Sequence, residues 1–146
     1  MAVDVTTEIV IRRPVAEVAA YAGDPTNAPQ WYANIRSVDL KTPPPLAQGS
    51  QMAFVATFLG RTLSYTYEVV ELVAGERLTM RTAEGPFPMV TTYKWTSLAP
   101  DETRMTLSNA GTPSGFATVA TPLIASSMRR AMTKDLSALK RILEHR

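Results

Sequence analysis

The segment PVAEVAAYAGDPTNAPQWYANIRSVDLKT, residues 14–42, changes its structural pattern twice and decides the fold. Pro14 suits the first turn of a short helix, and Asp24 with Pro25 suits the cap and first position of a second short helical piece. From Asn34 onward the pattern is that of a strand, which the three prolines at 43–45 end because they lack the N–H groups of a ladder. The segment therefore predicts two short helices followed by a strand.

Further strands are expected on both sides of this segment. Residues 2–11 alternate between apolar and polar side chains, which is typical of a half-buried strand. Five more strands are predicted at about 50–59, 62–72, 76–83, 88–98 and 102–110, separated by short turn-like stretches. Because no helix intervenes, these strands predict an antiparallel meander. Apolar residues at helical spacing then predict one long helix over 116–145, which Pro122 either kinks or begins.

The composition restricts the classes of function. The chain has 146 residues, of which 45% are hydrophobic and 19% charged, and we expect a single domain over 1–146. A net charge of +2 is too small to indicate a nucleic-acid partner. The absence of cysteine excludes disulfides and thiolate metal sites. No secretory signal and no apolar run of membrane-spanning length is visible, so we expect a cytoplasmic protein without integral membrane association.

Three stretches resemble a known family. They are residues 14–42, DETRMTLS at 101–108 and PLIASSMRRAMTKDLSALKRILE at 122–144. Together they are similar to the polyketide cyclase/dehydrase group of the START-like (SRPBCC), helix-grip superfamily. The resemblance implies an α+β fold in which a curved antiparallel sheet of six to seven strands wraps around the long C-terminal helix, with two short helices after the first strand. It also implies a ligand cavity between the sheet and that helix, used in the family by aromatases, cyclases and carriers of lipids or quinones.

Strand parity predicts which side chains face the concave side of the sheet. Lys94, Glu68 and Arg104 are assigned to the solvent face, which turns their neighbours inward. All four strand methionines then point inward, together with three tyrosines and a tryptophan. The predicted ligand-binding residues are Tyr32, Met52, Phe54, Phe58, Tyr65, Tyr67, Met80, Met89, Thr91, Tyr93, Trp95 and Met105, with Phe116 and Met128 from the final helix.

This inward set has two interpretations. Methionine and aromatic side chains commonly fill an irregular core. They also line cavities for apolar guests, and hydroxyl groups buried among them need polar partners. Under the second interpretation Tyr65, Tyr67, Tyr93 and Thr91 would orient a ligand. Trp31 would anchor the structure, Tyr32 would reach the mouth of the cavity, and the loop carrying Phe87 would form a second lip.

The usual catalytic motifs are missing from the sequence. The one histidine, His145, is next to last in the chain, and no pair of carboxylates is predicted inside the cavity. What is left is a tyrosine acting as an acid or enolate stabiliser, with Tyr65 and Tyr93 as weak candidates assisted by Arg36 or Arg61. We expect neither a metal nor a cofactor.

Three functions follow from these observations. The first is binding of a small hydrophobic or aromatic molecule such as a lipid, quinone or polyketide-like compound. The second is an enzyme of the cyclase, aromatase or dehydratase type that uses the same cavity. The third is a protein-interaction module of the same fold whose convex or helical surface binds another protein.

Overall fold

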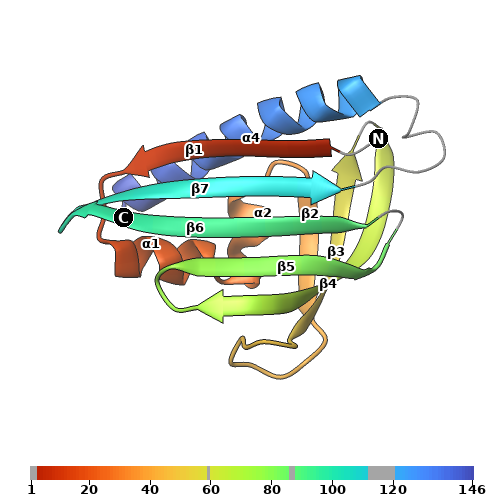
Figure 1. The fold of residues 1–146 in the computed structure, drawn as a ribbon, viewed down its shortest axis with the longest axis horizontal. Coiled ribbons are helices and arrows are strands. Elements are labelled where there is room, and N and C mark those ends of the chain that lie inside the picture. The colour runs from red at the N-terminus through yellow and green to blue at the C-terminus, as the bar shows by residue number, and fades with distance from the viewer. Residues whose placement is uncertain (1–2, 59, 86–87, 112–120) are drawn as a thin grey trace.

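The computed structural model describes residues 3–58, 60–85, 88–111 and 121–146, and Figure 1 shows their arrangement. The elements are β1 (Val3–Ile11), α1 (Val15–Ala22), a 3-10 helix η1 (Pro25–Asn27), α2 (Ala28–Trp31), β2 (Ile35–Leu40), β3 (Gln51–Phe58), β4 (Arg61–Val73), β5 (Arg77–Glu84), β6 (Met89–Ala99), β7 (Glu102–Gly111) and α4 (Thr121–Glu144). The predicted strands are all present. Residues 116–120 of the expected final helix lie outside the described residues, and Pro122 falls in the first turn of α4.

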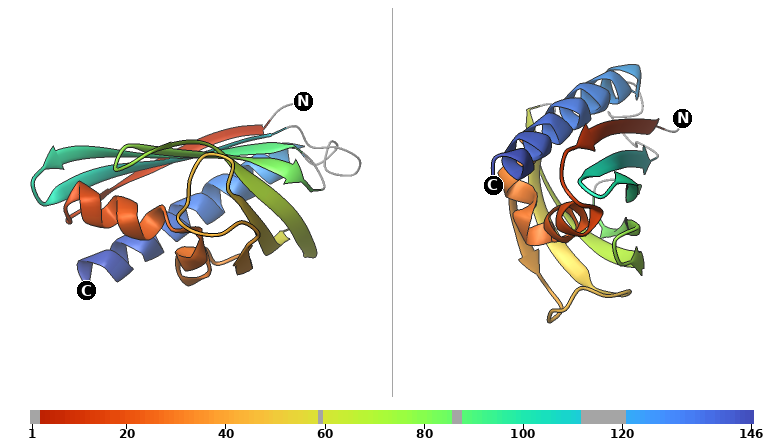
Figure 2. Two further views of the ribbon diagram at one scale, coloured as in Figure 1. Left: turned by 90° about the horizontal axis from the view of Figure 1, so that it is seen from below. Right: turned by 90° about the vertical axis from the view of Figure 1, so that its left-hand side faces the viewer.

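The seven strands form one antiparallel sheet in the order β1-β7-β6-β5-β4-β3-β2. Strands β2 to β7 are a meander, whereas β1 crosses to the far side and pairs with β7 from Val3↔Gly111 to Ile11↔Thr103. The helical segment of residues 14–42 therefore connects the two edges of the sheet. The sheet curls around α4, as the two views of Figure 2 show, which confirms the predicted α+β architecture.

The core lies between the concave face of the sheet and one side of α4. Leu136, Leu139 and Leu143 of α4 are almost completely buried. From the strands, Met52, Met80 and Met105 are equally buried, in agreement with the parity of the sequence pattern. Burying a large apolar side chain contributes about 1.5–3 kcal/mol, so this contact holds α4 in place.

Side chains of α4 lie along the outer edge of β1. β1 is an edge strand of the sheet, and its outward backbone groups are those that a strand of another chain would pair with. In the structure the Lys140 ammonium donates to the Val10 carbonyl at 2.8 Å, and the Arg129 guanidinium donates to the Thr6 carbonyl at 3.3 Å. The Glu144 carboxylate accepts the Arg12 N–H at 2.8 Å. These side chains engage two outward carbonyl groups of β1 and the N–H that follows it, so part of the edge is occupied.

The short helices after β1 are set by local contacts. The Asp24 carboxylate accepts the N–H of Thr26 at 3.0 Å, and Pro25 fills the first position of η1. At Gly23 a Cβ would lie 2.5 Å from the Ala19 carbonyl oxygen and 3.2 Å from the ring of Trp95. Glycine is required there because α1 ends against β6 with no room for a side chain.

Candidate functional site

A cavity of about 130 Å³ lies between the concave face of the sheet and α4. We call it the inner cavity. Its walls come from the segment after α2, from β3 to β7 and from α4, and most of them are apolar. The lining residues are Tyr32, Asn34, Ile35, Ala56, Thr57, Leu63, Tyr65, Thr82, Met89, Asn109, Met128, Ala131, Met132 and Asp135.

Two buried hydroxyl networks support the wall of the inner cavity. The phenol groups of Tyr32 and Tyr93 are hydrogen-bonded at 2.7 Å. The Thr91 hydroxyl donates to the Asn109 amide oxygen at 2.5 Å, and the Tyr67 hydroxyl lies 2.5 Å from the same Thr91 oxygen. Since the single hydrogen of Thr91 is given to Asn109, Tyr67 must be the donor in its own bond. Two tyrosines line the cavity, Tyr32 and Tyr65. Tyr32 is bonded to Tyr93, whereas Tyr65 makes no hydrogen bond among the described residues.

The aromatic rings around these hydroxyl groups pack against one another. Tyr65 stacks on Phe54 with ring centroids 5.3 Å apart and contacts Tyr67 edge-on at 5.1 Å. Trp31 is buried, and its ring lies 4.2 Å from that of Tyr32. Such pairs contribute about 0.5–1.5 kcal/mol beyond their buried area, so the positions of the tyrosines are fixed by their neighbours.

Burial keeps these tyrosines neutral. It raises the pKa of Tyr67 to about 12 and raises the pKa values of Tyr32, Tyr65 and Tyr93 well above the ordinary value, with neighbouring phenols adding to the effect for Tyr32 and Tyr65. At physiological pH they are therefore hydrogen-bond donors and acceptors and not bases.

Asp135, like Asn109 and Met132, lines the inner cavity and was missed by the sequence analysis. It is 3% exposed on the inner face of α4, and its Oδ1 accepts the Ala33 N–H at 3.0 Å. Burial raises the pKa of Asp135 to about 6, although the Ala33 N–H and the Lys134 ammonium both lower it. A carboxyl group with this pKa can hold or release a proton near neutral pH. Its place three residues after Met132 and four before Leu139 is the signal that could have found it.

The predicted ligand-binding residues fall into distinct places. Tyr32, Tyr65, Met89 and Met128 line the inner cavity. Met52, Phe54, Tyr67, Met80, Thr91, Tyr93 and Met105 are buried in the core and do not line it. Trp95 is buried and lines a different hollow. Phe87 and Phe116, and the side chain of Phe58, lie outside the described residues.

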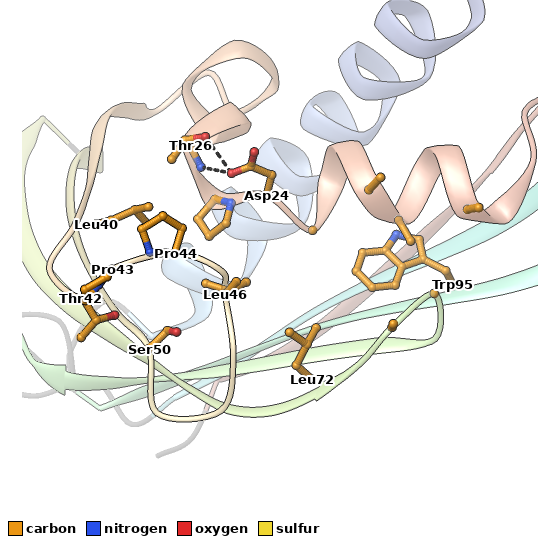
Figure 3. A pocket seen from close by; sticks show the side chains of 17 residues that line it. Asp24, Thr26, Leu40, Thr42, Pro43, Pro44, Leu46, Ser50, Leu72 and Trp95 are labelled. Atoms are coloured by element: carbon orange, nitrogen blue, oxygen red, sulfur yellow. Dashed lines mark hydrogen bonds between the residues drawn. The ribbon is translucent and has the colours of Figure 1, made fainter.

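Two larger grooves lie elsewhere. One of about 660 Å³, the α1 groove, is bounded by α1, η1, the β2–β3 loop and the β4–β5 turn. Figure 3 shows its walls, with Pro43, Pro44 and Leu46 on one side and Trp95 at one end. The other, of about 530 Å³, lies between α2 and α4. Volume alone would favour the α1 groove, but its described lining residues include no buried carboxyl group and no buried tyrosine of the kind around the inner cavity.

Comparison with known proteins places the chain in a family. Residues 2–144 match the model of the family described as polyketide cyclase / dehydrase and lipid transport. The chain belongs to this family. A search of curated protein sequences gave no match.

Several solved structures share the fold of this chain. The chain is similar to the Zhui aromatase/cyclase from Streptomyces sp. R1128, with 15% identity, a TM-score of 0.83 and coverage of 100% of this chain and 96% of that one. It is also similar to a START superfamily protein from Mycobacterium smegmatis, with 14% identity, a TM-score of 0.84 and 97% of each chain covered. A protein from Thermus thermophilus has 18% identity, a TM-score of 0.82 and 94% of each chain covered. At these identities the likeness shows the helix-grip fold alone.

Two further features bear on this polyketide cyclase/dehydrase-type domain. Among the described residues, no three histidine, cysteine, aspartate or glutamate side chains come together as a metal site. No helix in the described ranges is both long enough and apolar enough to cross a membrane. The chemistry that the described residues offer at the inner cavity is thus apolar contact, neutral phenol hydrogen bonds and one titratable carboxyl group.

Proposed function

We propose that the inner cavity binds a small apolar or aromatic molecule and orients it through a polar group. The observation that carries this proposal is the contrast between the largely apolar surface of the cavity and the smaller number of polar groups in its lining, which include those of Tyr65, Asn109 and Asp135. Ligand sites are commonly apolar with a small number of polar groups that fix orientation. Three methionines, Met89, Met128 and Met132, line the cavity, and their flexible side chains adapt to the shape of a guest.

The size of the inner cavity limits what it holds. Its volume of about 130 Å³ is below the roughly 300–1,000 Å³ of drug-sized ligand sites. An engineered apolar cavity of about 150 Å³ in another protein binds benzene. The part of the ligand that enters is therefore one aromatic ring or a short chain. A lipid or a polyketide with several rings exceeds this volume, so only a portion of such a molecule would lie inside.

A calorimetric titration with 4-phenylbutan-1-ol tests the proposal. The wild-type protein should bind this probe with a stoichiometry of one. Ala56→Leu adds three carbon atoms to a residue that lines the cavity, and it should abolish binding. Ala53→Leu is the matched control, because Ala53 lies on the opposite face of the same strand. Equal binding by all three proteins, or by none, would refute the proposal. Native mass spectrometry of the purified protein would identify any small molecule that it already carries.

A second candidate function is acid–base catalysis on the same bound molecule, and Asp135 is the observation that favours it. The carboxylate could take a proton from the carbon next to a ketone, leaving an enolate whose oxygen accepts a hydrogen bond from a neutral tyrosine. Tyr65 lines the cavity without a hydrogen-bond partner among the described residues, so its hydroxyl is available for this role. The proton returns from Asp135 to carbon when the enolate collapses. This chemistry is of the class used in cyclisation and dehydration.

Deuterium exchange separates binding from catalysis. 4-Phenylbutan-2-one in D₂O should incorporate deuterium next to its carbonyl faster with the wild-type protein than with buffer. Asp135→Asn should lose this acceleration while retaining binding of the ketone, because the amide oxygen can still accept the Ala33 N–H. Acceleration that is unchanged in Asp135→Asn would show that Asp135 is not the base, and a wild type that exchanges no faster than buffer would be a carrier and not an enzyme of this type.

A further inference from the structure

The groove between α2 and α4 carries a concentration of positive charge. We call it the α2–α4 groove. Residues 29–33, 35 and 36 form one wall, and Lys134, Ser137, Ala138 and Arg141 lie on the other. These helix positions are three to four residues apart and share one face of α4. With Arg36 from the opposite wall, three cationic side chains line a hollow of about 530 Å³.

Some cations elsewhere on the molecule are held in ion pairs. Lys140 is paired with Glu144 at 2.6 Å, and Arg77 and Arg81 are paired with Glu71 and Glu68. Within the described ranges, Arg36, Lys134 and Arg141 have no ion pair and no hydrogen bond. All three are exposed. The single acidic residue among the described walls of the groove is Asp135, whose Oδ1 is engaged by Ala33. The net charge of the groove is therefore positive.

The α2–α4 groove adjoins the inner cavity. Tyr32, Ile35 and Asp135 line both hollows. A molecule with its apolar end in the inner cavity and its charged end in the groove would contact these three residues from both sides. The volume of the inner cavity also requires that most of a larger ligand lie outside it.

We propose that the α2–α4 groove binds the carboxylate or phosphate group of an amphipathic molecule whose apolar end occupies the inner cavity. This inference rests on the proposed binding function and adds the class of ligand to it. Arg36 and Arg141 present planar guanidinium groups that can hold an oxyanion through two parallel hydrogen bonds, and Lys134 adds a point charge. Because all three side chains are exposed, salt weakens their attraction for the anion.

Matched probes test the inference. They are 4-phenylbutyrate, 4-phenylbutyl phosphate and the neutral 4-phenylbutan-1-ol, which share one apolar end. At low ionic strength the protein should bind at least one of the anions about tenfold more tightly than the alcohol, as three weak exposed ion pairs allow. Added salt should reduce this preference without changing the affinity for the alcohol. A preference for the phosphate alone or for the carboxylate alone identifies which oxyanion the groove accepts.

Two double variants test whether the preference for the anion arises in the α2–α4 groove. Lys134→Gln with Arg141→Gln should remove the preference for the anion and leave the affinity for the alcohol unchanged. Lys94→Gln with Arg104→Gln removes the same charge from exposed positions on β6 and β7 that do not line the groove, and it should leave the preference intact. If both double variants lose the preference equally, the effect is one of net charge and the inference is overturned.

The outcomes also distinguish this inference from the proposed function. Equal affinity of the wild-type protein for alcohol and anions, independent of salt, would overturn the anion site and leave the cavity proposal standing. Binding of the anions that persists in Ala56→Leu would show a groove that acts alone and would overturn the link to the cavity. Absence of binding by every probe would count against both.

Discussion

The hydroxyl groups of Tyr32 and Tyr93 meet at 2.7 Å, although the two residues are 61 positions apart in the sequence. Tyr32 follows α2, and Tyr93 lies in the middle of β6, between β5 and β7 in the sheet. The bond ties the helical segment to the sheet beside the inner cavity. It also satisfies two buried hydroxyl groups that would otherwise be without partners.

Breaking this pair should cost stability in a non-additive way. Tyr32→Phe or Tyr93→Phe should each lower the free energy of unfolding by about 1–2 kcal/mol, because each leaves the other phenol buried without a partner. The double variant should lose little more than either single one, since both polar groups are then gone. Urea unfolding of the four proteins measures the coupling. Strictly additive losses would show that the two hydroxyl groups do not depend on each other.

Asp135 should give the protein a distinct dependence of stability on pH. Its pKa of about 6 lies above the ordinary value of 3.8, so between these values the folded state holds a proton that the unfolded state has released. Stability contributed by this group is therefore greatest below about pH 4 and is lost as the pH rises through 6. Asp135→Asn cannot ionise and should be more stable than the wild type by up to about 3 kcal/mol above pH 7.

The control for this prediction is the same comparison at low pH. The difference in the free energy of unfolding between the wild type and Asp135→Asn should shrink as the pH falls toward 4, where both side chains are neutral. Thermal unfolding at several pH values measures it. A wild type that is more stable than the variant at pH 8 would mean that the buried carboxylate is stabilised by contacts beyond the Ala33 N–H.

Thr91 should be sensitive to the loss of its hydroxyl group. Thr91→Val keeps the shape but leaves the Tyr67 hydroxyl and the Asn109 amide oxygen without their partner, and it should cost about 1–3 kcal/mol. Thr96→Val on the same strand is exposed and should have little effect. The two variants are compared by urea unfolding. Similar losses for both would mean that the cost arises from the strand and not from the buried network.

Much of the fold could be predicted from local patterns. Local structure can be predicted from three features: the alternation of apolar and polar residues in β1, the prolines at 14, 25 and 43–45, and the apolar stripe of α4. Each feature is set by residues close together in the sequence. Inward placement of Met52, Met80 and Met105 followed from the period of two and the charged neighbours on the other face. Such patterns are sufficient to predict the elements because apolar side chains recur at regular spacing along the buried face of each one.

The candidate site was less predictable, because it depends on distances between elements. The alternation along β6 predicts that Tyr93 and Met89 face inward. It does not predict that Tyr93 is hydrogen-bonded to Tyr32 or that Met89 lines the inner cavity. Asp135 was missed because an acidic residue on a helix is ordinarily assigned to solvent, and the Ala33 N–H that donates to it belongs to a segment distant in the sequence. The volume of the inner cavity depends on side-chain rotamers and the position of α4, which no local pattern contains.

Binding in the inner cavity can be located by an NMR titration of protein labelled at its methionine methyl groups, with 4-phenylbutan-1-ol as the probe. Of the seven methionines, Met89, Met128 and Met132 line the inner cavity, whereas Met52, Met80 and Met105 are buried away from it. If the cavity is the binding site, the methyl signals of the first three will shift and saturate together, and those of the other three will move little. Signals that shift elsewhere, or that do not shift at any probe concentration, would contradict the account.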